Sequence, residues 1–371
     1  MSPEPLVETV ALSKEFPLPR TVTETFHRRP ARAVHAVDSV SLALQPGETL
    51  GLIGESGSGK TTFGWLLSRL HDATSGEIRF DGQEIGRLTG AALRAWRRNV
   101  QVVFQDPVGS LDPRLKVWEI VAEPIRVQEK LRGGSSPSRG EMRARVQATL
   151  PQVGLPPDCL DQYAHEFSGG GRQRISLARA FSVDPRLIVL DEPTSALDVS
   201  VQAQILNRLV DLQRARGLAY LLITHNVAAV RFAADRVAVM YLGQVVEVGD
   251  VRAVLDAPVH PYTKALIAAL PRTDPSRRHA RYRITGDIPT LIDPKPGCRF
   301  APRCPFAKEP CRLADPPLRP APGASGHLVA CVRAEEVGAI PPSALLESAE
   351  APPTGVEPAV AAPGRPGSSV S

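Results

Sequence analysis

Residues 54–61 read GESGSGKT, and this segment restricts the possible folds of the chain more than any other. It matches the pattern G-x-x-x-x-G-K-[ST], follows the aliphatic run at 50–54 and precedes helical apolar spacing at 60–70. Glycines let backbone N–H groups converge on phosphate oxygens, and the positive N-terminal end of the following helix faces the same oxygens. The strand and helix on either side argue against a solvated Gly-rich turn, so we predict a nucleoside triphosphate site.

Two side chains of this loop have distinct expected roles. Lys60 is expected to neutralise the β- and γ-phosphates, and the Thr61 hydroxyl is expected to ligate Mg²⁺. The residues predicted to bind the nucleotide are Gly54, Glu55, Ser56, Gly57, Ser58, Gly59, Lys60, Thr61 and Thr62.

Further aliphatic runs predict the sheet that carries this loop. Residues 100–105, 186–192 and 219–225 are continuous and aliphatic rather than alternating, which is typical of parallel strands buried on both faces. Amphipathic stretches separate them, so we predict an α/β fold with a largely parallel sheet. RVAVMYLGQVVEVG at 236–249 predicts a hairpin around Gly243.

Composition excludes several classes of protein. Apolar residues are 43% and charged residues 22% of the chain, which indicates a globular rather than a disordered protein. The net charge of +5 is small for 371 residues, so we expect no nucleic-acid partner. No apolar run approaches the roughly 18 residues of a membrane helix, and the N-terminus lacks an export signal. We therefore expect a cytosolic chain that can still dock on a membrane protein.

Polar side chains follow three of the predicted strands. Asp191 and Glu192 end RLIVLDE, His225 ends AYLLITH and Gln105 ends VQVVFQ. Because parallel strands place their carboxyl ends at one edge, these groups should lie beside the phosphate loop rather than being solvated or structural. We expect Asp191, with Thr61, to bind Mg²⁺ directly or through its ligands, and the Gln105 amide to bind Mg²⁺ or water. The other catalytic residues are Glu192, which is expected to polarise the attacking water, and His225, which is expected to sense the γ-phosphate.

The stretch HEFSGGGRQRISLARAF at 165–181 resembles the signature motif of ABC transporter ATPases. The resemblance covers about residues 6–255 and implies an ABC-type P-loop cassette with a mostly parallel core sheet, an antiparallel β subdomain and a helical signature subdomain. It also implies that ATP is the nucleotide, that the signature contacts the nucleotide of a partner ATPase, and that an aromatic side chain stacks on adenine. The residues carrying these implied roles are Ser168, Gly169, Gly170 and Gly171 in the signature, Ser195 and Asp198 in the D-loop, and Phe16 at adenine.

One position departs from the family pattern. The family commonly reads LSGGQ, whereas this chain reads FSGGG, with Gly171 in place of Gln. We expect the loss of this side-chain amide to weaken the contact between the signature and the ATP bound by the partner ATPase. Gln has the better helix propensity, by up to about 1 kcal/mol, so Gly171→Gln is expected to leave stability no lower.

Segments 103–125, 235–250 and 260–271 resemble the ATPase subunits of bacterial oligopeptide and dipeptide importers, most closely the second of their two ATPases. This implies ATP hydrolysis that drives peptide import, with residues 106–125 receiving a permease helix. The implied partners are a second ATPase subunit (different or identical), two permease subunits and an extracytoplasmic solute-binding protein. The implied location is peripheral, on the cytoplasmic side of the inner membrane. Nickel or other small-solute importers, a soluble non-transport ABC ATPase and a regulatory subunit with poor turnover are the alternatives.

Beyond the cassette the chain changes character. We predict an ATPase domain at 1–255 with its helical subdomain at about 106–182, a Pro- and Cys-rich extension at 256–335, and a disordered tail at 336–371. Four cysteines within the extension resemble a feature of the importer ATPases that holds a [4Fe–4S] cluster in some relatives, with Zn²⁺ or simple packing as alternatives. They are Cys298, Cys304, Cys311 and Cys331. Since residues 298–331 lie outside the cassette, ATP hydrolysis is expected to survive loss of a metal centre bound there.

Overall fold

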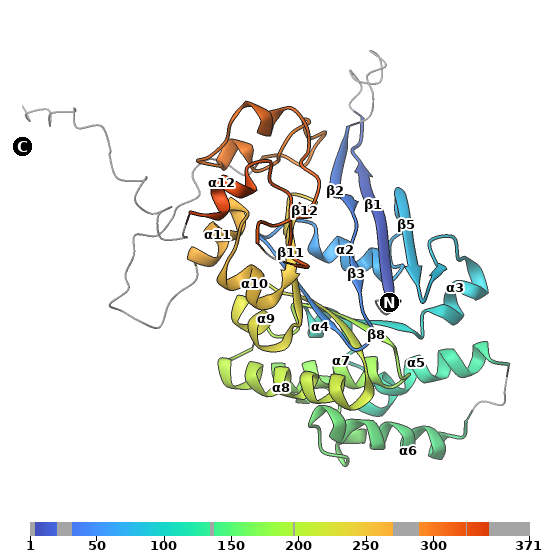
Figure 1. Cartoon of the computed structure of the whole chain (residues 1–371). Helices are drawn as coiled ribbons and strands as arrows, with labels where there is room; N and C mark the ends of the chain where they lie inside the picture. Colours follow the sequence, from blue (N-terminus) through green and yellow to red (C-terminus); the bar gives the residue numbers. More distant parts are fainter. Residues whose placement is uncertain are drawn as a thin grey trace, which may run out of the picture.

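The computed structural model describes residues 4–20, 32–133, 137–195, 197–269, 289–323 and 325–340. At the centre of this part of the chain is a mixed sheet of eight strands (Figure 1). Their order is β12 (Arg319–Pro320), β13 (Leu328–Val329), β11 (Gln244–Asp250), β10 (Arg236–Tyr241), β4 (Thr49–Ile53), β9 (Ala219–Ile223), β8 (Leu187–Asp191) and β7 (Val100–Val103).

The five strands from β10 to β7 run parallel, and the sequence predicted four of them. All residues of β4, β8 and β9 are buried because helices cover both faces of the sheet. Leu50 and Leu52 pack with Phe63 of α2 (Lys60–Leu67), whereas Gly51 faces Val230 of α9 (Val227–Ala233). The expected parallel core is therefore confirmed.

The predicted hairpin is also present, and it joins β10 to β11. The two strands pair antiparallel, and the turn at Leu242 and Gly243 has φ angles of 43° and 85°. Glycine adopts this left-handed conformation without strain. Because β10 pairs with β4 on its other side, the hairpin turn lies beside the loop that follows β4.

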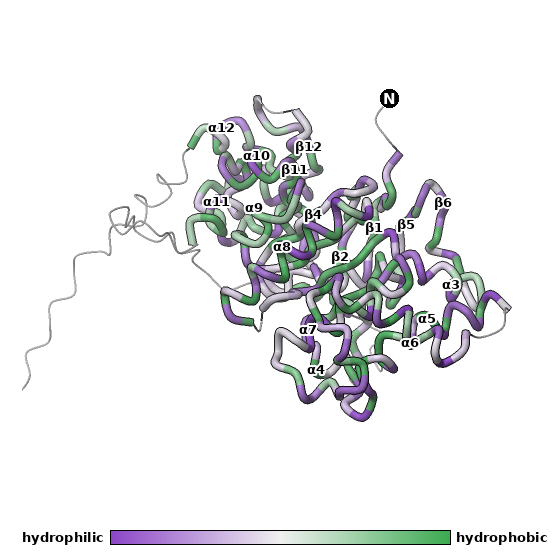
Figure 2. Tube along the Cα trace, turned by 90° about the horizontal axis from the view of Figure 1, so that it is seen from below, coloured by the Kyte–Doolittle hydropathy of each residue, from purple (hydrophilic) through white to green (hydrophobic). Residues whose placement is uncertain are grey.

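A second, antiparallel sheet stands beside the first (Figure 1). It consists of β2 (Ala33–Val40), β1 (Val7–Pro17), β5 (Ser75–Phe80) and β6 (Gln83–Glu84), with β3 (Ala43–Leu44) paired to β1. Inner residues such as Leu12 and Ile78 join the core shared with α2, whereas β6 is exposed and hydrophilic (Figure 2).

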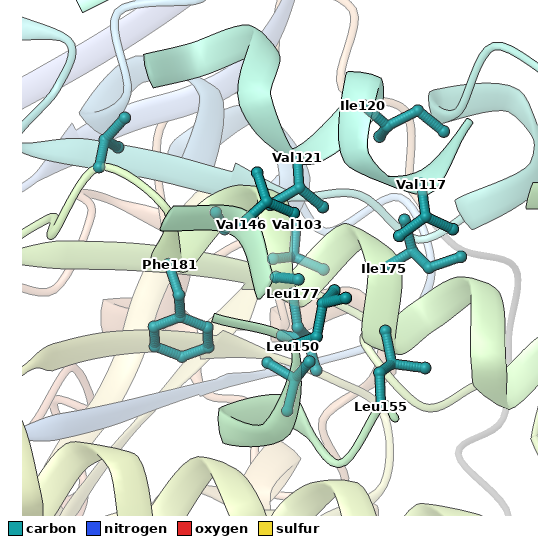
Figure 3. Packing of buried hydrophobic residues seen from close by; sticks show 14 of the residues in the cluster. Val103, Val117, Ile120, Val121, Val146, Leu150, Leu155, Ile175, Leu177 and Phe181 are labelled. Carbon is teal, nitrogen blue, oxygen red and sulfur yellow. The ribbon is translucent and has the colours of Figure 1, made fainter. Parts of the chain in front are cut away.

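A group of helices forms the lower part of the molecule in Figure 1. It contains α4 (Pro107–Ser110), α5 (Val117–Leu131), α6 (Arg139–Thr149), α7 (Gly169–Phe181) and, at its border, α8 (Val199–Arg216). Their apolar faces meet in one buried cluster around Val121, Val146 and Leu177 (Figure 3). This packing holds α7 rigidly and leaves Ser168, at its N-terminal end, exposed.

The remaining helices are short. They are α3 (Gly90–Trp96), α10 (Val251–Asp256), α11 (Pro261–Ala268), α12 (Ala334–Gly338) and the 3₁₀ helices η1 (Leu150–Val153), η2 (Cys159–Asp161), η3 (Ala164–Glu166), η5 (Ala301–Arg303) and η6 (Glu309–Arg312). No helix in the described part of the chain combines the length and apolar character that a membrane crossing needs.

The C-terminal extension packs on the cassette and continues its central sheet. Strand β13 pairs with β11, and Phe300 is buried in the same cluster as Tyr241 and Tyr262. The expected start of the tail at residue 336 falls inside α12, so the chain remains ordered past that boundary. Residues 341–371, the rest of the predicted tail, lie outside the described residues.

Candidate functional site

The phosphate loop has a shape that requires glycine at two positions. It connects β4 to α2, and Gly54 and Gly59 have φ angles of 154° and 102°. A Cβ atom on Gly54 would lie 2.1 Å from Met240 O, and one on Gly59 would lie 2.1 Å from Ala36 O. Close approach of β10 and β2 to the loop therefore excludes any side chain at either position.

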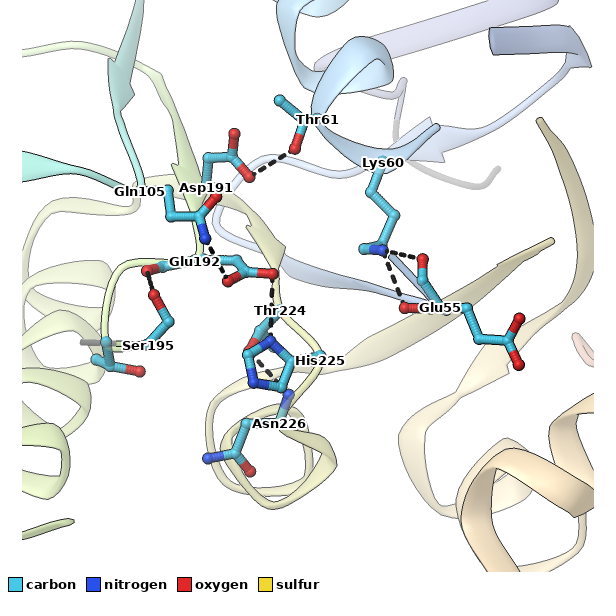
Figure 4. A network of polar contacts seen from close by, with 12 residues as sticks. Glu55, Lys60, Thr61, Gln105, Asp191, Glu192, Ser195, Thr224, His225 and Asn226 are labelled. Carbon is cyan, nitrogen blue, oxygen red and sulfur yellow. Dashed lines mark hydrogen bonds and ion pairs between the residues drawn. The ribbon is translucent and has the colours of Figure 1, made fainter. Parts of the chain in front are cut away.

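Lys60 lies across the inside of this loop (Figure 4). Its Nζ donates to Gly54 O at 2.9 Å, to Glu55 O at 2.7 Å and to Ser58 Oγ at 3.2 Å. Burial lowers the pKa of Lys60, and the negative charges of Glu192, Asp191 and Glu55 act in the opposite direction. The ammonium group is thus held by two carbonyls and a hydroxyl of the loop.

Thr61 and Asp191, two of the predicted Mg²⁺ ligands, lie together at the edge of the sheet. Thr61 Oγ1 donates to Asp191 Oδ1 at 3.1 Å, and Asp191 is buried. Burial raises the pKa of Asp191, although the hydrogen bond from Thr61 lowers it. A hydroxyl and a buried carboxylate beside a phosphate loop provide the oxygen ligands that Mg²⁺ prefers.

Glu192 connects the other predicted catalytic residues (Figure 4). Gln105 Nε2 donates to Glu192 Oε2 at 3.0 Å, and His225 Nδ1 lies 3.2 Å from Glu192 Oε1. The Glu192 side chain is 18% exposed and that of His225 is 65% exposed. Because β7, β8 and β9 end at the same edge, side chains that are far apart in sequence converge beside the phosphate loop.

The signature residues lie at a different place, at the start of α7. Ser168 Oγ accepts from Gly171 N at 3.3 Å and so caps the helix. A Cβ on Gly170 would lie 2.6 Å from Val201 Cγ1 of α8, so this glycine permits the two helices to approach. Figure 1 shows α7 among the lower helices, on the opposite side of the sheet region from α2. This chain's own phosphate loop and signature are therefore apart.

Asp198 and Ser195, the predicted D-loop residues, lie between β8 and α8. Asp198 caps α8 by accepting from Val201 N at 2.9 Å, and Ser195 Oγ donates to Glu192 O at 3.2 Å. Ser195 thereby links the D-loop to the backbone of the candidate water-activating residue.

Phe16 lies near the end of β1, in the antiparallel sheet. Its ring is edge-on to that of His71, with centroids 5.7 Å apart, and Lys14 Nζ lies 5.1 Å from its centroid. The structure thus shows a partly exposed aromatic ring at the position that family resemblance assigns to adenine. Residues 21–31, between β1 and β2, lie outside the described part.

The sequence analysis missed two side chains that contact the phosphate loop from the extension. Tyr262 OH accepts from Glu55 N at 2.8 Å, and Arg303 Nη1 lies 3.0 Å from Glu55 Oε2. No sequence signal identifies these contacts, because 248 residues separate Arg303 from Glu55. Although the extension lies outside the cassette in sequence, it contacts the phosphate loop, and survival of ATP hydrolysis without a metal centre stays a prediction.

The four clustered cysteines do come together. They line one apolar cavity of about 20 Å³, and all are free thiols. Burial raises the pKa of Cys298 to about 11 and that of Cys304 to about 12. Within the described ranges, no three or more His, Cys, Asp or Glu side chains have the arrangement of a metal site. Cys159 lies elsewhere, in the helical core.

Comparisons with known proteins agree with this geometry. Residues 37–195 match the family model described as ABC transporter, and residues 246–311 match the one described as oligopeptide/dipeptide transporter, C-terminal region. The probable peptide ABC transporter ATP-binding protein y4tS of Sinorhizobium fredii is 45% identical over 93% of this chain and 95% of its own length. The dipeptide transport ATP-binding protein DppF of Escherichia coli is 40% identical over 90% of this chain and 96% of its own.

Among solved structures, the ATP-binding cassette MJ0796 in a dimeric post-hydrolysis state with ADP and phosphate has a TM-score of 0.58 and 27% identity. It aligns over 66% of this chain and 99% of its own length. The fold, the site and both family models agree: this chain belongs to the ATP-binding subunits of ABC transporters that carry an oligopeptide/dipeptide transporter C-terminal region.

Proposed function

We propose that this chain hydrolyses ATP to energise import of oligopeptides or dipeptides through a separate membrane permease. The observation that carries the proposal is the network of Gln105, Glu192 and His225 beside Lys60 and the phosphate loop. The relatives named for peptide and dipeptide transport, and the C-terminal match, favour peptide import over nickel import or a non-transport role.

The chemistry we assign to the site is positioning and electrostatic stabilisation. Lys60 and the loop amides hold the β- and γ-phosphates, while Thr61, Asp191 and Gln105 hold Mg²⁺, which supplies positive charge to the phosphate oxygens. Glu192 orients and polarises the attacking water. His225, within 3.2 Å of Glu192, holds that carboxylate in place and contacts the γ-phosphate.

We further propose that the signature serves the nucleotide of a second ATPase. Ser168 and Gly169 are exposed at the N-terminal end of α7, where backbone N–H groups form an anion site. The partner in this proposal is a different ATPase subunit, with two identical subunits as the alternative outcome. Two permease subunits, an extracytoplasmic solute-binding protein and a peripheral position on the cytoplasmic face of the inner membrane complete the proposal.

Purification of the tagged chain from detergent-solubilised membranes of its native host tests these assignments. Mass spectrometry of co-purified subunits identifies the permease and distinguishes a different partner ATPase from an identical one. The complex, reconstituted in vesicles with its binding protein, is then supplied with labelled peptide or labelled Ni²⁺. ATP-dependent uptake of peptide supports the proposal, whereas uptake of Ni²⁺ alone, or absence of any permease, contradicts it.

For the four cysteines we propose a [4Fe–4S] cluster, with Zn²⁺ as the alternative. Support comes from four thiols that line one apolar cavity, where a metal cation offsets the cost of ionising buried thiols. Iron, sulfide and zinc analysis of anaerobically purified protein, with Cys304→Ser as the comparison, tests this. Four titratable thiols with no metal would show that the cysteines only pack.

A further inference from the structure

Glu55, the second residue of the phosphate loop, is held at three points. Its N–H donates to Tyr262 OH at 2.8 Å, its carbonyl accepts from Lys60 Nζ at 2.7 Å, and its carboxylate pairs with Arg303. The backbone N–H and the backbone C=O of Glu55 thus each have a hydrogen-bond partner. Two of the three partners, Tyr262 and Arg303, come from beyond residue 255, in the extension.

The pairing of Glu55 with Arg303 is bidentate. Arg303 Nη1 lies 3.0 Å from Glu55 Oε2, and Nη2 lies 3.4 Å from Oε1. Arg303 is only 8% exposed, and its Nη1 also donates to Tyr241 OH at 3.2 Å. A bidentate guanidinium–carboxylate pair fixes orientation as well as distance. The pair therefore restricts where the Glu55 side chain and the loop backbone can lie.

Arg303 and Tyr262 lie beside or within a buried cluster of aromatic rings. Tyr241, Tyr262 and Phe300 form an aromatic cluster, with ring centroids 4.6 to 5.5 Å apart. All three rings are almost fully buried. Phe300 lies three residues before Arg303, at the start of η5, so the same packing anchors the segment that supplies the guanidinium.

A second set of contacts connects the segment around Arg303 to the phosphate loop. Arg299 donates to Leu242 O and pairs with Asp38, and the neighbouring Gly243 N donates to Ser58 O at 2.9 Å. Residues 298–304, bounded by two of the clustered cysteines, therefore support the loop directly at Glu55 and through the β10–β11 turn at Ser58.

We propose that Arg303, together with Tyr262, is a positioning residue for ATP binding that sets the phosphate loop in its binding conformation from outside the cassette. Ordering a glycine-rich loop costs conformational entropy, and a loop that is already ordered binds its ligand more tightly. The inference rests on the proposed role of residues 54–62 in ATP binding. Arg303 and Tyr262 touch the loop and not the reacting atoms, so their effect belongs to affinity rather than to chemistry.

The test measures the affinity of the full-length chain for a fluorescent ATP analogue, together with KM and kcat of the assembled ATPase. Arg303→Met is expected to raise the dissociation constant and KM about tenfold while kcat stays within about twofold. Arg303→Lys keeps the charge but loses the bidentate geometry, so it is expected to recover part of the affinity. Arg319 is an exposed arginine of the extension that contacts no residue of the phosphate loop. Arg319→Met is therefore the matched control and is expected to leave the affinity for the ATP analogue unchanged.

Glu55→Gln provides a second route if Arg303→Met does not fold. The amide side chain keeps the volume and the backbone contacts of Glu55 but removes the charge, so the dissociation constant is expected to rise by a similar factor. In a double variant with Arg303→Lys, Glu55→Gln is expected to raise the dissociation constant little beyond its value in the Arg303→Lys variant. Unchanged affinity in either folded single variant overturns the proposal. Lys60→Ala distinguishes failure of this proposal from failure of the proposed ATP site. Normal ATP binding by the Lys60→Ala variant would overturn the proposed role of the phosphate loop itself.

Discussion

The ring of Phe167 occupies the space that a Cβ atom on Gly171 would need. Such an atom would lie 2.9 Å from both Cβ and Cδ1 of Phe167, closer than carbon atoms approach without displacement. Family signatures commonly carry Leu and Gln at these positions, so the two departures in this chain are sterically linked. The expectation that Gly171→Gln leaves stability no lower considered only helix propensity, and this contact argues against it.

We therefore predict that Gly171→Gln lowers the free energy of unfolding by about 1 kcal/mol or more, because overpacking outweighs the gain in helix propensity. Phe167→Leu in the same chain is expected to recover only part of that loss, because it removes the aromatic ring but keeps the Cβ atom of residue 167, which lies 2.9 Å from the added Cβ. Urea unfolding of both single variants and the double variant measures the coupling. Strictly additive effects would contradict the steric link.

The same double variant tests the proposed partner of the signature. Hydrolysis at the partner's nucleotide is expected to change when residue 171 carries an amide, while the ATP affinity of the isolated chain stays the same. Phosphate release by the assembled pair, with the partner's own catalytic glutamate intact, is the measurement. A changed affinity in the isolated chain, without any effect on the pair, would count against the assignment.

Glu192→Gln is expected to retain ATP affinity and to lose turnover by about 100-fold or more, because the amide cannot polarise water. Its similar shape preserves the contact with Gln105 at 3.0 Å. Lys60→Ala is expected instead to weaken nucleotide binding. Parallel measurements of ATP affinity and phosphate release, with the partner ATPase present, separate the two defects. Normal turnover by the Glu192 variant would remove this residue from catalysis.

Asp191→Asn is expected to raise the Mg²⁺ concentration for half-maximal hydrolysis about tenfold, because the variant loses the carboxylate that Thr61 orients. ATP affinity measured in EDTA is expected not to fall, since Asp191 repels rather than attracts phosphate. A titration of ATP hydrolysis with Mg²⁺ gives the Mg²⁺ concentration for half-maximal activity. Equal losses with and without Mg²⁺ would indicate a general distortion of the site.

Two glycines of the phosphate loop form a matched pair. Gly59→Ala is expected to abolish nucleotide binding, because its Cβ would lie 2.1 Å from Ala36 O. Gly57 also has a positive φ, of 78°, but nothing lies within 4 Å of its Cβ position. Gly57→Ala is therefore expected to cost only about 1–2 kcal/mol of backbone strain. Thermal unfolding and nucleotide binding of the two variants should differ accordingly, and equal defects would argue against exclusion of a side chain by β2.

Much of the site could be predicted because its signals are local. The glycine loop between a strand and a helix, and the polar residues ending aliphatic runs, each fall within a few residues of sequence. Parallel pairing of β8 with β7 and β9 then brings Gln105, Asp191, Glu192 and His225 to one edge without further information. The clustering of four cysteines in a segment of 34 residues likewise predicted that they meet, and they line one cavity.

Contacts between segments that carry no shared pattern could not be predicted. The hydrogen bond from Glu55 to Tyr262, the Arg303–Glu55 pair and the continuation of α12 past residue 335 depend on how the extension packs against β10 and β11. Even the clash between Phe167 and residue 171, four positions apart, depends on the direction of an aromatic ring at a helix start.

The sequence by itself determined the α/β cassette, its phosphate loop and the residues at the ends of its strands, because backbone periodicity and glycine spacing are local properties of the chain. Only the tertiary structure decided that the extension contacts this loop through Glu55. The physical reason is that the Glu55–Arg303 pair depends on packing that brings the two charges within about 3–4 Å, and distance in space is not encoded by distance along the chain.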